Sequence, residues 1–222
     1  MFKKILDNTS PDSTANKFRR KRFRYFTELI QNDPLPVKIL DVGGTENFWV
    51  QMGYYANKNY QITVLNIDVQ QTHTKENLTF VHGDAADLSK FGDKEFDIVF
   101  SNSVIEHIPM NTERRKMANE IIRTGKKYFV QTPNYYFPFD PHFLFPCFQF
   151  LPNLLQILML KNFNMGWFKK CGSAAEAESL LESNRLLKCA ELRSYIPAAT
   201  IISEKFMLMT KSYIAVNAGL SA

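Results

Sequence analysis

The chain has 222 residues, of which 45% are hydrophobic and 22% are charged. This is enough for one α/β domain with its own core, and it excludes a disordered or fibrous chain. The net charge of +5 comes from residues 1–24, which hold eight Lys or Arg and two Asp or Glu, while the remainder holds 19 basic and 20 acidic residues. A slightly acidic body argues against a nucleic-acid-binding protein.

Three cysteines are widely spaced along the chain, at positions 147, 171 and 189. Their odd number and the lack of a C-x-x-C pair argue against a disulfide framework or a zinc site and fit a reducing compartment. The sequence "MFKKILDNTS" has too short an apolar run for a secretory signal. We therefore expect a cytoplasmic protein.

The first predicted element is a helix in residues 16–31, "NKFRRKRFRYFTELIQ", which Pro34 then stops. Its apolar residues recur at helical spacing, so one face packs on the domain. The basic residues predict a solvated outer face, with a contact to nucleic acid or anionic lipid as the alternative. Residues 1–33 form this basic N-terminal arm of a single domain that covers residues 1–222.

Five apolar, β-prone runs follow and alternate with polar or helical stretches. They occupy residues 38–42, 61–69, 78–85, 96–103 and 126–133. An amphipathic helix over 111–125 joins the last two of them. Strands this apolar, linked by crossovers, predict a mostly parallel sheet covered by helices on both faces.

Residues 134–170 break this alternation, because they are rich in aromatic residues and proline. Their most apolar part, 143–160, has the length of a membrane span but is interrupted by Pro146 and Pro152. We interpret the segment as an inserted aromatic lid with short helices, and additional core or a membrane-contacting surface are the alternatives. A C-terminal hairpin, joined tightly through Thr210 and Lys211, is predicted to complete the sheet.

Three acidic residues stand at the ends of three successive predicted strands: Asp41, Asp68 and Asp84. Open parallel sheets bind ligands at this edge. Gly43 and Gly44 follow the first acid and would let a ligand approach the backbone. The loop is not G-x-G-x-x-G, so a pyrophosphate site is disfavoured. Acids on three strands instead suit a ligand with a ribose, an amino group and positive charge, although helix capping also favours Asp.

The order "VKILDVGG", "IDV", "HGDAADL" and "FDIVFSNSVIEHI" resembles the class I S-adenosylmethionine (SAM)-dependent methyltransferases, in particular their UbiE/type-11-like group. The resemblance implies a Rossmann-like seven-stranded sheet of order 3-2-1-4-5-7-6, with SAM as cofactor and S-adenosylhomocysteine as product. It implies that Gly43 and Gly44 lie under the methionine part, with Asp41 near its amino group. Asp68 would then bind the ribose.

The resemblance also implies positions for the other end of the cofactor. Asp84, together with Ala85, would contact the adenine. Ser101 and Asn102, at the end of the fourth strand, would lie beside the sulfonium. The chain departs from the group at Thr45-Glu46-Asn47, where many members continue with glycines.

Two histidines are the candidates for catalysis. If the methyl acceptor is a hydroxyl, a base helps to remove its proton, and His107 and His142 are the residues placed to do so. Packing or bracing of the lid is the alternative for both. The pair formed by Glu106 and His107 resembles one in quinone-precursor O-methyltransferases, some of which use a metal there. The sequence has only part of such a metal site, so we expect no metal.

We therefore predict a SAM-dependent methyltransferase (EC 2.1.1 class) that methylates oxygen of a small-molecule or glycan acceptor. A lipid-linked acceptor would explain the apolar lid and the basic arm through peripheral membrane contact. The alternative from another class is a non-catalytic SAM-fold partner subunit or pseudoenzyme. A nucleotide-dependent oxidoreductase is disfavoured by the glycine placement, and a nucleic-acid methyltransferase by the charge.

Overall fold

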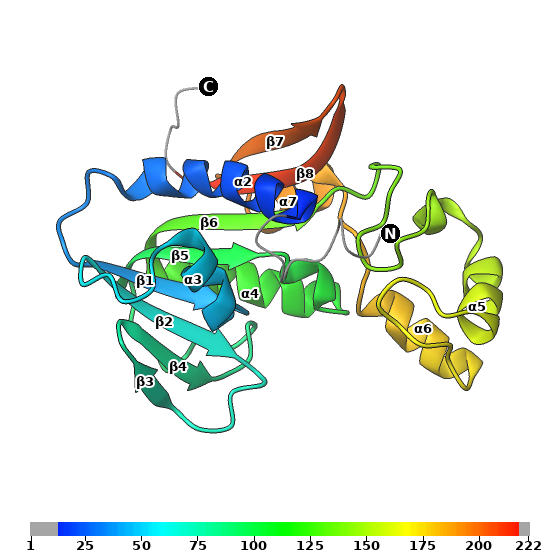
Figure 1. Cartoon of the computed structure of the whole chain (residues 1–222), viewed down its shortest axis with the longest axis horizontal. Coiled ribbons are helices and arrows are strands. Elements are labelled where there is room, and N and C mark those ends of the chain that lie inside the picture. The colour runs from blue at the N-terminus through cyan, green and yellow to red at the C-terminus, as the bar shows by residue number, and fades with distance from the viewer. Residues whose placement is uncertain (1–12, 218–222) are drawn as a thin grey trace.

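The computed structural model describes residues 13–217, so the first twelve residues of the predicted arm lie outside it. Within that range the chain forms one mixed sheet whose parallel strands point the same way (Figure 1). The strands are β1 (Val37–Val42), β2 (Tyr60–Asn66), β3 (His73–Lys75), β4 (Leu78–His82), β5 (Phe96–Asn102), β6 (Gly125–Pro133), β7 (Thr200–Phe206) and β8 (Met209–Val216).

The strand order is β3-β4-β2-β1-β5-β6-β8-β7. Without β3 this is the predicted order 3-2-1-4-5-7-6, so the Rossmann-like methyltransferase fold is confirmed. The additional strand β3 pairs antiparallel to β4 at the edge of the sheet. The sequence did not reveal β3, because its three residues are all exposed and carry no apolar pattern.

Helices cover both faces of the sheet (Figure 1). On one face, α2 (Thr14–Ile30) and α3 (Glu46–Met52) contribute Phe26 and Trp49 to the core. On the other face, α4 (Asn111–Thr124) and α7 (Cys189–Tyr195) contribute Met117 and Leu192. The helix predicted over 111–125 is therefore present, and its apolar face is buried as its periodicity indicates.

Helix α2 begins where the side chain of Ser13 accepts a hydrogen bond from the backbone of Asn16, a typical N-terminal cap. Its apolar residues pack on the sheet as predicted. The prediction that its basic residues are all solvated is wrong for Arg22, which is buried. Arg22 shares the inward face of the helix with Phe26, four residues further along.

The C-terminal hairpin is present and supplies the antiparallel strands, but its turn was misplaced in the sequence. Thr210 and Lys211 lie inside β8, and the strands turn at Met207 and Leu208. Tight hairpin turns favour Gly, Asn or Asp, and a Met-Leu turn carries none of these signals. Met207 adopts a positive φ of 54° there.

The segment between β6 and β7 extends beyond the carboxyl end of the sheet (Figure 1). It contains the short helix η2 (Phe148–Phe150), then α5 (Asn153–Asn162) and α6 (Ala174–Glu182). A separate apolar cluster, which includes Phe143, Phe148 and Leu160, holds it together. No helix in residues 13–217 is long and apolar enough to cross a membrane.

Candidate functional site

The residues that the sequence singled out gather along the carboxyl edge of the sheet. Asp41 lies in β1 opposite Phe100 of β5, and Asn102 ends β5. Asp68 and Asp84 each lie two residues beyond the end of their strands, β2 and β4. Because parallel strands end at one edge, these groups surround the site where such sheets bind ligands.

Asp41 is almost fully buried, and its Oδ2 accepts a hydrogen bond of 2.7 Å from Trp49 Nε1. Burial raises the pKa of Asp41 to about 7, against the opposing effects of the Trp49 hydrogen bond and the Arg19 charge. The carboxyl group is thus held in place and ready for a cationic partner. An ammonium group brought beside it would favour its charged form.

The two glycines have a physical role that the sequence did not show. A Cβ on Gly44 would lie 1.6 Å from Asp41 Oδ2, and a Cβ on Gly43 would lie 2.6 Å from Val104. Gly43 also has a φ of +80°, which favours glycine. The space beside these glycines is filled by the chain's own side chains, and Asn66 Nδ2 fixes the loop by donating to the Gly44 carbonyl.

The Asp41 carboxyl predicts an unusual pH dependence in the cofactor-free protein. Its folded-state pKa of about 7 lies above the value of about 4 for an unfolded chain. Between these values the folded state binds the proton more tightly, so the contribution of Asp41 to stability falls as pH rises. We expect the free energy of unfolding of Asp41→Asn to rise relative to that of the wild type as pH increases across this range, by up to about 1.4 kcal/mol per pH unit.

Urea denaturation of both proteins from pH 4.5 to pH 8 measures the difference in their free energies of unfolding. Titratable groups that both proteins share contribute equally to the two values and therefore drop out of the difference. Two curves that run parallel over the whole range would contradict the assigned protonation of Asp41.

Asp68 and Asp84 are both exposed. The carboxylate of Asp84 accepts a hydrogen bond from the backbone of Ala86, which is the local turn chemistry considered as the alternative role. Ala85 is partly buried against the core. The backbone N–H of Asp68 donates a hydrogen bond to Asn66 Oδ1, and the residue is exposed to solvent, where a ribose could reach its side chain.

At the end of β5, the hydroxyl of Ser101 is buried and has no hydrogen-bond partner in the structure. Asn102 Oδ1 accepts a hydrogen bond of 2.6 Å from Arg22 of α2. Arg22 Nε also lies 3.3 Å from Glu204 of β7. The strand tip predicted beside the sulfonium is therefore joined to the N-terminal helix by a hydrogen bond from Arg22, which also forms a buried ion pair with β7.

Two more cations lie near Arg22 and were not singled out in the sequence. Burial and the Arg22 charge lower the pKa of Arg19, whereas the charge of Asp41 raises it. Burial and Arg22 also lower the pKa of Lys211 to about 8, and its ammonium lies 4.0 Å from the Phe18 ring centroid. Arg19, Arg22 and Lys211 thus form a group of partly or fully buried cations, of which Arg19 lies near Asp41.

The structure brings His107 and His142 together, although 35 positions separate them in the chain. Their ring centroids are 4.8 Å apart, and ligand atoms of Glu106, His107 and His142 all lie within 4.8 Å of one another. Glu106 is fully buried: Oε2 accepts from the Thr132 hydroxyl, and Oε1 has no partner in the structure. A buried carboxylate oxygen without a partner is costly unless it meets a proton or a cation.

Each imidazole has a polar neighbour. His107 Nδ1 lies 3.1 Å from the carbonyl oxygen of Ser183, which can only accept, so Nδ1 carries the hydrogen and Nε2 presents a lone pair. His142 Nδ1 lies 3.3 Å from Asp140 Oδ1. The two atoms form no hydrogen bond in the structure, because Asp140 Oδ1 accepts from the backbone of His142 and Phe143.

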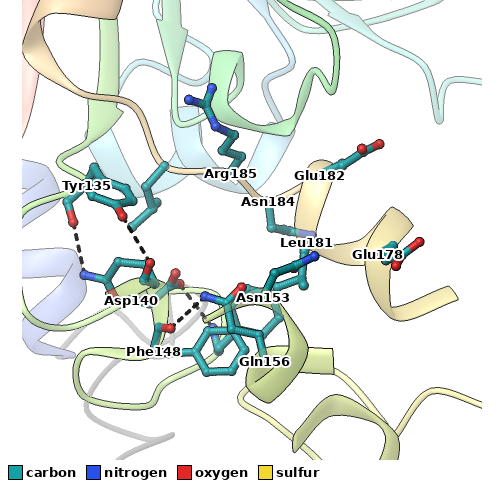
Figure 2. Close-up of a pocket in the computed structure, with 13 residues that line it drawn as sticks. Tyr135, Asp140, Phe148, Asn153, Gln156, Glu178, Leu181, Glu182, Asn184 and Arg185 are labelled. Atoms are coloured by element: carbon teal, nitrogen blue, oxygen red, sulfur yellow. Dashed lines mark hydrogen bonds between the residues drawn. The ribbon is translucent and has the colours of Figure 1, made fainter. Parts of the chain in front are cut away.

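A cavity of about 330 Å³ lies between the segment that follows β6 and helix α6. Figure 2 shows the polar side chains that surround it from both sides. Its aromatic wall is formed by Tyr135, Phe143 and Phe148, whereas Glu178 and Glu182 line it from α6. The buried Oε1 of Gln149, another lining residue, has no partner in the structure. Asp140, which lies 3.3 Å from His142, is a lining residue, whereas His107, His142, Asp68 and Asp84 are not.

Comparison with known proteins agrees with this arrangement. Residues 40–128 match the family model described as a methyltransferase domain. A SAM-dependent methyltransferase from Methanosarcina mazei superposes with a TM-score of 0.53 at 15% identity, covering 85% of this chain and 95% of that one. Magnesium protoporphyrin IX methyltransferase from Synechocystis, solved with S-adenosylhomocysteine bound, gives 0.51 at 12% identity, covering 91% and 85%.

A carbon methyltransferase, CurJ, gives a TM-score of 0.55 at 12% identity and covers 92% of this chain and 55% of that one. Two uncharacterized proteins of Mycobacterium tuberculosis, from strains CDC 1551 and H37Rv, are 41% identical over 56 residues. That match covers 25% of this chain and about a fifth (19%) of each relative.

The domain match and the fold agree with the motifs. This chain carries the methyltransferase domain and the fold of class I SAM-dependent methyltransferases. The resemblance found in the sequence is thereby confirmed, and SAM is the cofactor expected for this fold.

Proposed function

We propose that the protein transfers a methyl group from SAM to a hydroxyl oxygen of a polyhydroxylated small molecule or glycan. The observation that carries the proposal is the convergence of His107 and His142, with Asp140 lying both beside His142 and in the wall of a cavity. Carboxylates, amides and aromatic rings suit an acceptor with several hydroxyl groups and apolar faces. The unpaired cysteines favour a cytoplasmic location.

The bound cofactor supplies an activated methyl group, so the protein mainly has to position the acceptor and exclude water. In the proposed reaction the C–S bond breaks as the C–O bond forms. The acceptor proton passes to Nε2 of His107 or His142, and a methyl ether and S-adenosylhomocysteine result. The Ser183 carbonyl accepts from the His107 ring, and the nearby Asp140 carboxylate would stabilise a His142 imidazolium.

Glu106, His107 and His142 also fit a divalent cation, which the sequence analysis did not expect. Two imidazoles and one carboxylate are a common set of ligands for transition metals, and their ligand atoms lie within 4.8 Å of one another. When bound, such an ion would make the acceptor hydroxyl more acidic. The oxygen of Glu106 that lacks a partner supports this possibility.

Calorimetric titration with SAM, alongside Asp68→Ala, tests the cofactor part of the proposal. A hydrogen bond from a ribose hydroxyl to a carboxylate contributes about 1.5–3 kcal/mol, so the variant should bind about 10- to 100-fold more weakly. Asp93→Ala, which removes another exposed acid away from the strand tips, is the matched control. Equal affinities for wild type and Asp68→Ala would contradict the assigned role of Asp68.

The alternative is a partner subunit or pseudoenzyme that binds SAM without using it. A methyl-transfer screen with sugars, phenols and lipid-linked glycans separates the two functions. Tight SAM binding without turnover on any acceptor class, alone or with cell extract, would favour the non-catalytic function.

A further inference from the structure

The outer face of helix α5 has no partner in the described structure, although it is strongly apolar. Leu154, Leu155 and Leu158 are exposed, whereas Ile157 and Leu160 are buried in the apolar cluster beneath the helix. At 100° per residue, the three exposed leucines lie on the side of the helix opposite the buried pair. A helix with apolar side chains on both sides typically contacts another apolar surface in addition to the core of its own domain.

Exposed apolar side chains are concentrated around this helix. Seven of the fifteen large ones in residues 13–217 fall between positions 145 and 167. Such a concentration marks an interaction surface, because isolated exposed apolar residues are common but contiguous ones are not.

The charge around α5 indicates what this surface contacts. Residues 141–175 contain Lys161, Lys169 and Lys170 and no Asp or Glu. All three lysines are exposed. The next helix, α6, carries three exposed acids, Glu176, Glu178 and Glu182, of which the last two line the cavity.

We propose that the outer face of α5, with its leucines and the lysines that follow, docks on the surface of an anionic lipid membrane. Leucines enter the boundary between headgroups and acyl chains, while lysines remain among the anionic headgroups. The helix has ten residues, so it lies in the interface rather than crossing the bilayer. Four exposed basic residues of α2, spaced as i, i+3, i+4 and i+7, add positive charge to the protein: Lys17, Arg20, Lys21 and Arg24.

Co-sedimentation with phosphatidylcholine vesicles that contain phosphatidylglycerol tests the proposal, with pure phosphatidylcholine vesicles for comparison. Binding is expected at low salt on the anionic vesicles and should weaken as salt screens the lysines. Leu154→Ser/Leu158→Ser should bind about tenfold more weakly or worse, because each leucine loses its apolar contact. The two leucines are 80% and 56% exposed, so the fold should tolerate the change.

Leu208→Ser is the matched control, since this leucine at the hairpin turn is 96% exposed and lies outside α5. Its binding should equal that of the wild type. The assay needs neither SAM nor acceptor, so its failure is distinct from failure of the proposed function. Wild type that stays in the supernatant at low salt would overturn the proposal. So would a dimer that the α5 double variant abolishes, since this face would then bind a second copy.

Discussion

Replacing His142 with alanine is expected to lower the rate of methyl transfer by about 100-fold or more, because general-base catalysis contributes about 10²–10⁴. His142 lies in the segment after β6, next to His107 rather than at the strand tips proposed to bind SAM. SAM binding should therefore stay within about twofold of the wild type. The rate is measured as S-adenosylhomocysteine formation with the acceptor found in the screen.

Glu106→Gln extends this test to the buried carboxylate. The amide keeps the size of the side chain but cannot bind a cation as a charged ligand, so turnover should fall strongly if a metal takes part. A chelator separates the two roles. If it abolishes wild-type turnover and added divalent metal restores it, the three residues hold an ion. If it has no effect, the histidines act as the base.

His73→Ala is the matched control, because this exposed histidine lies on the edge strand β3, where its ring stacks on Phe80. Its turnover should equal that of the wild type. A wild-type rate in His142→Ala would exclude His142 from the chemistry and leave it the role of bracing the segment.

The strand tips could be predicted from sequence because they depend on local pattern. Each apolar run of five to nine residues identifies a strand, and the residues at its end must lie at the carboxyl edge of a parallel sheet. Asp41 and Asn102 could therefore be placed without knowing the path of the chain between them. The detailed environment of Asp41 could not, because Trp49 and Gly44 meet it through a turn whose shape depends on their contacts.

The groups that surround those tips come from distant parts of the chain. His142 reaches His107 because the inserted segment folds around a small core that includes Phe143, Phe148 and Leu160. No helical or strand periodicity in the sequence predicts the path of this segment. Arg22 reaches Asn102 across 80 positions. In sequence it is one of several basic residues in a row, and only the rotation of α2 distinguishes it from its exposed neighbours.

The rotation of α2 that buries Arg22 leads to the second prediction with a large expected effect. Glu204→Gln is expected to lower the free energy of unfolding by about 3–5 kcal/mol, because it leaves the Arg22 charge buried without its counter-charge. The Arg22 and Glu204 side chains are only 10% and 4% exposed, and Glu204 Oε2 also accepts from the Ser212 hydroxyl. Gln keeps the shape of Glu, so the measured change reports the lost charge rather than a cavity. Urea denaturation provides the measurement.

A double variant, Arg22→Met/Glu204→Met, shows whether the two charges depend on each other. It should be less destabilised than the sum of its two single variants, since removing both charges leaves neither one stranded. Lys75→Met is the control for charge removal, because the Lys75–Glu46 pair is exposed and should change stability by less than about 1 kcal/mol.

If Glu204→Gln proved no more destabilising than Lys75→Met, Arg22 would have to be stabilised by Asn102 alone. The N-terminal helix would then be free to leave the strand tip without breaking a buried ion pair. The expected loss of several kcal/mol means the opposite: α2 is held over the cofactor edge by an interaction that spans α2, β5 and β7.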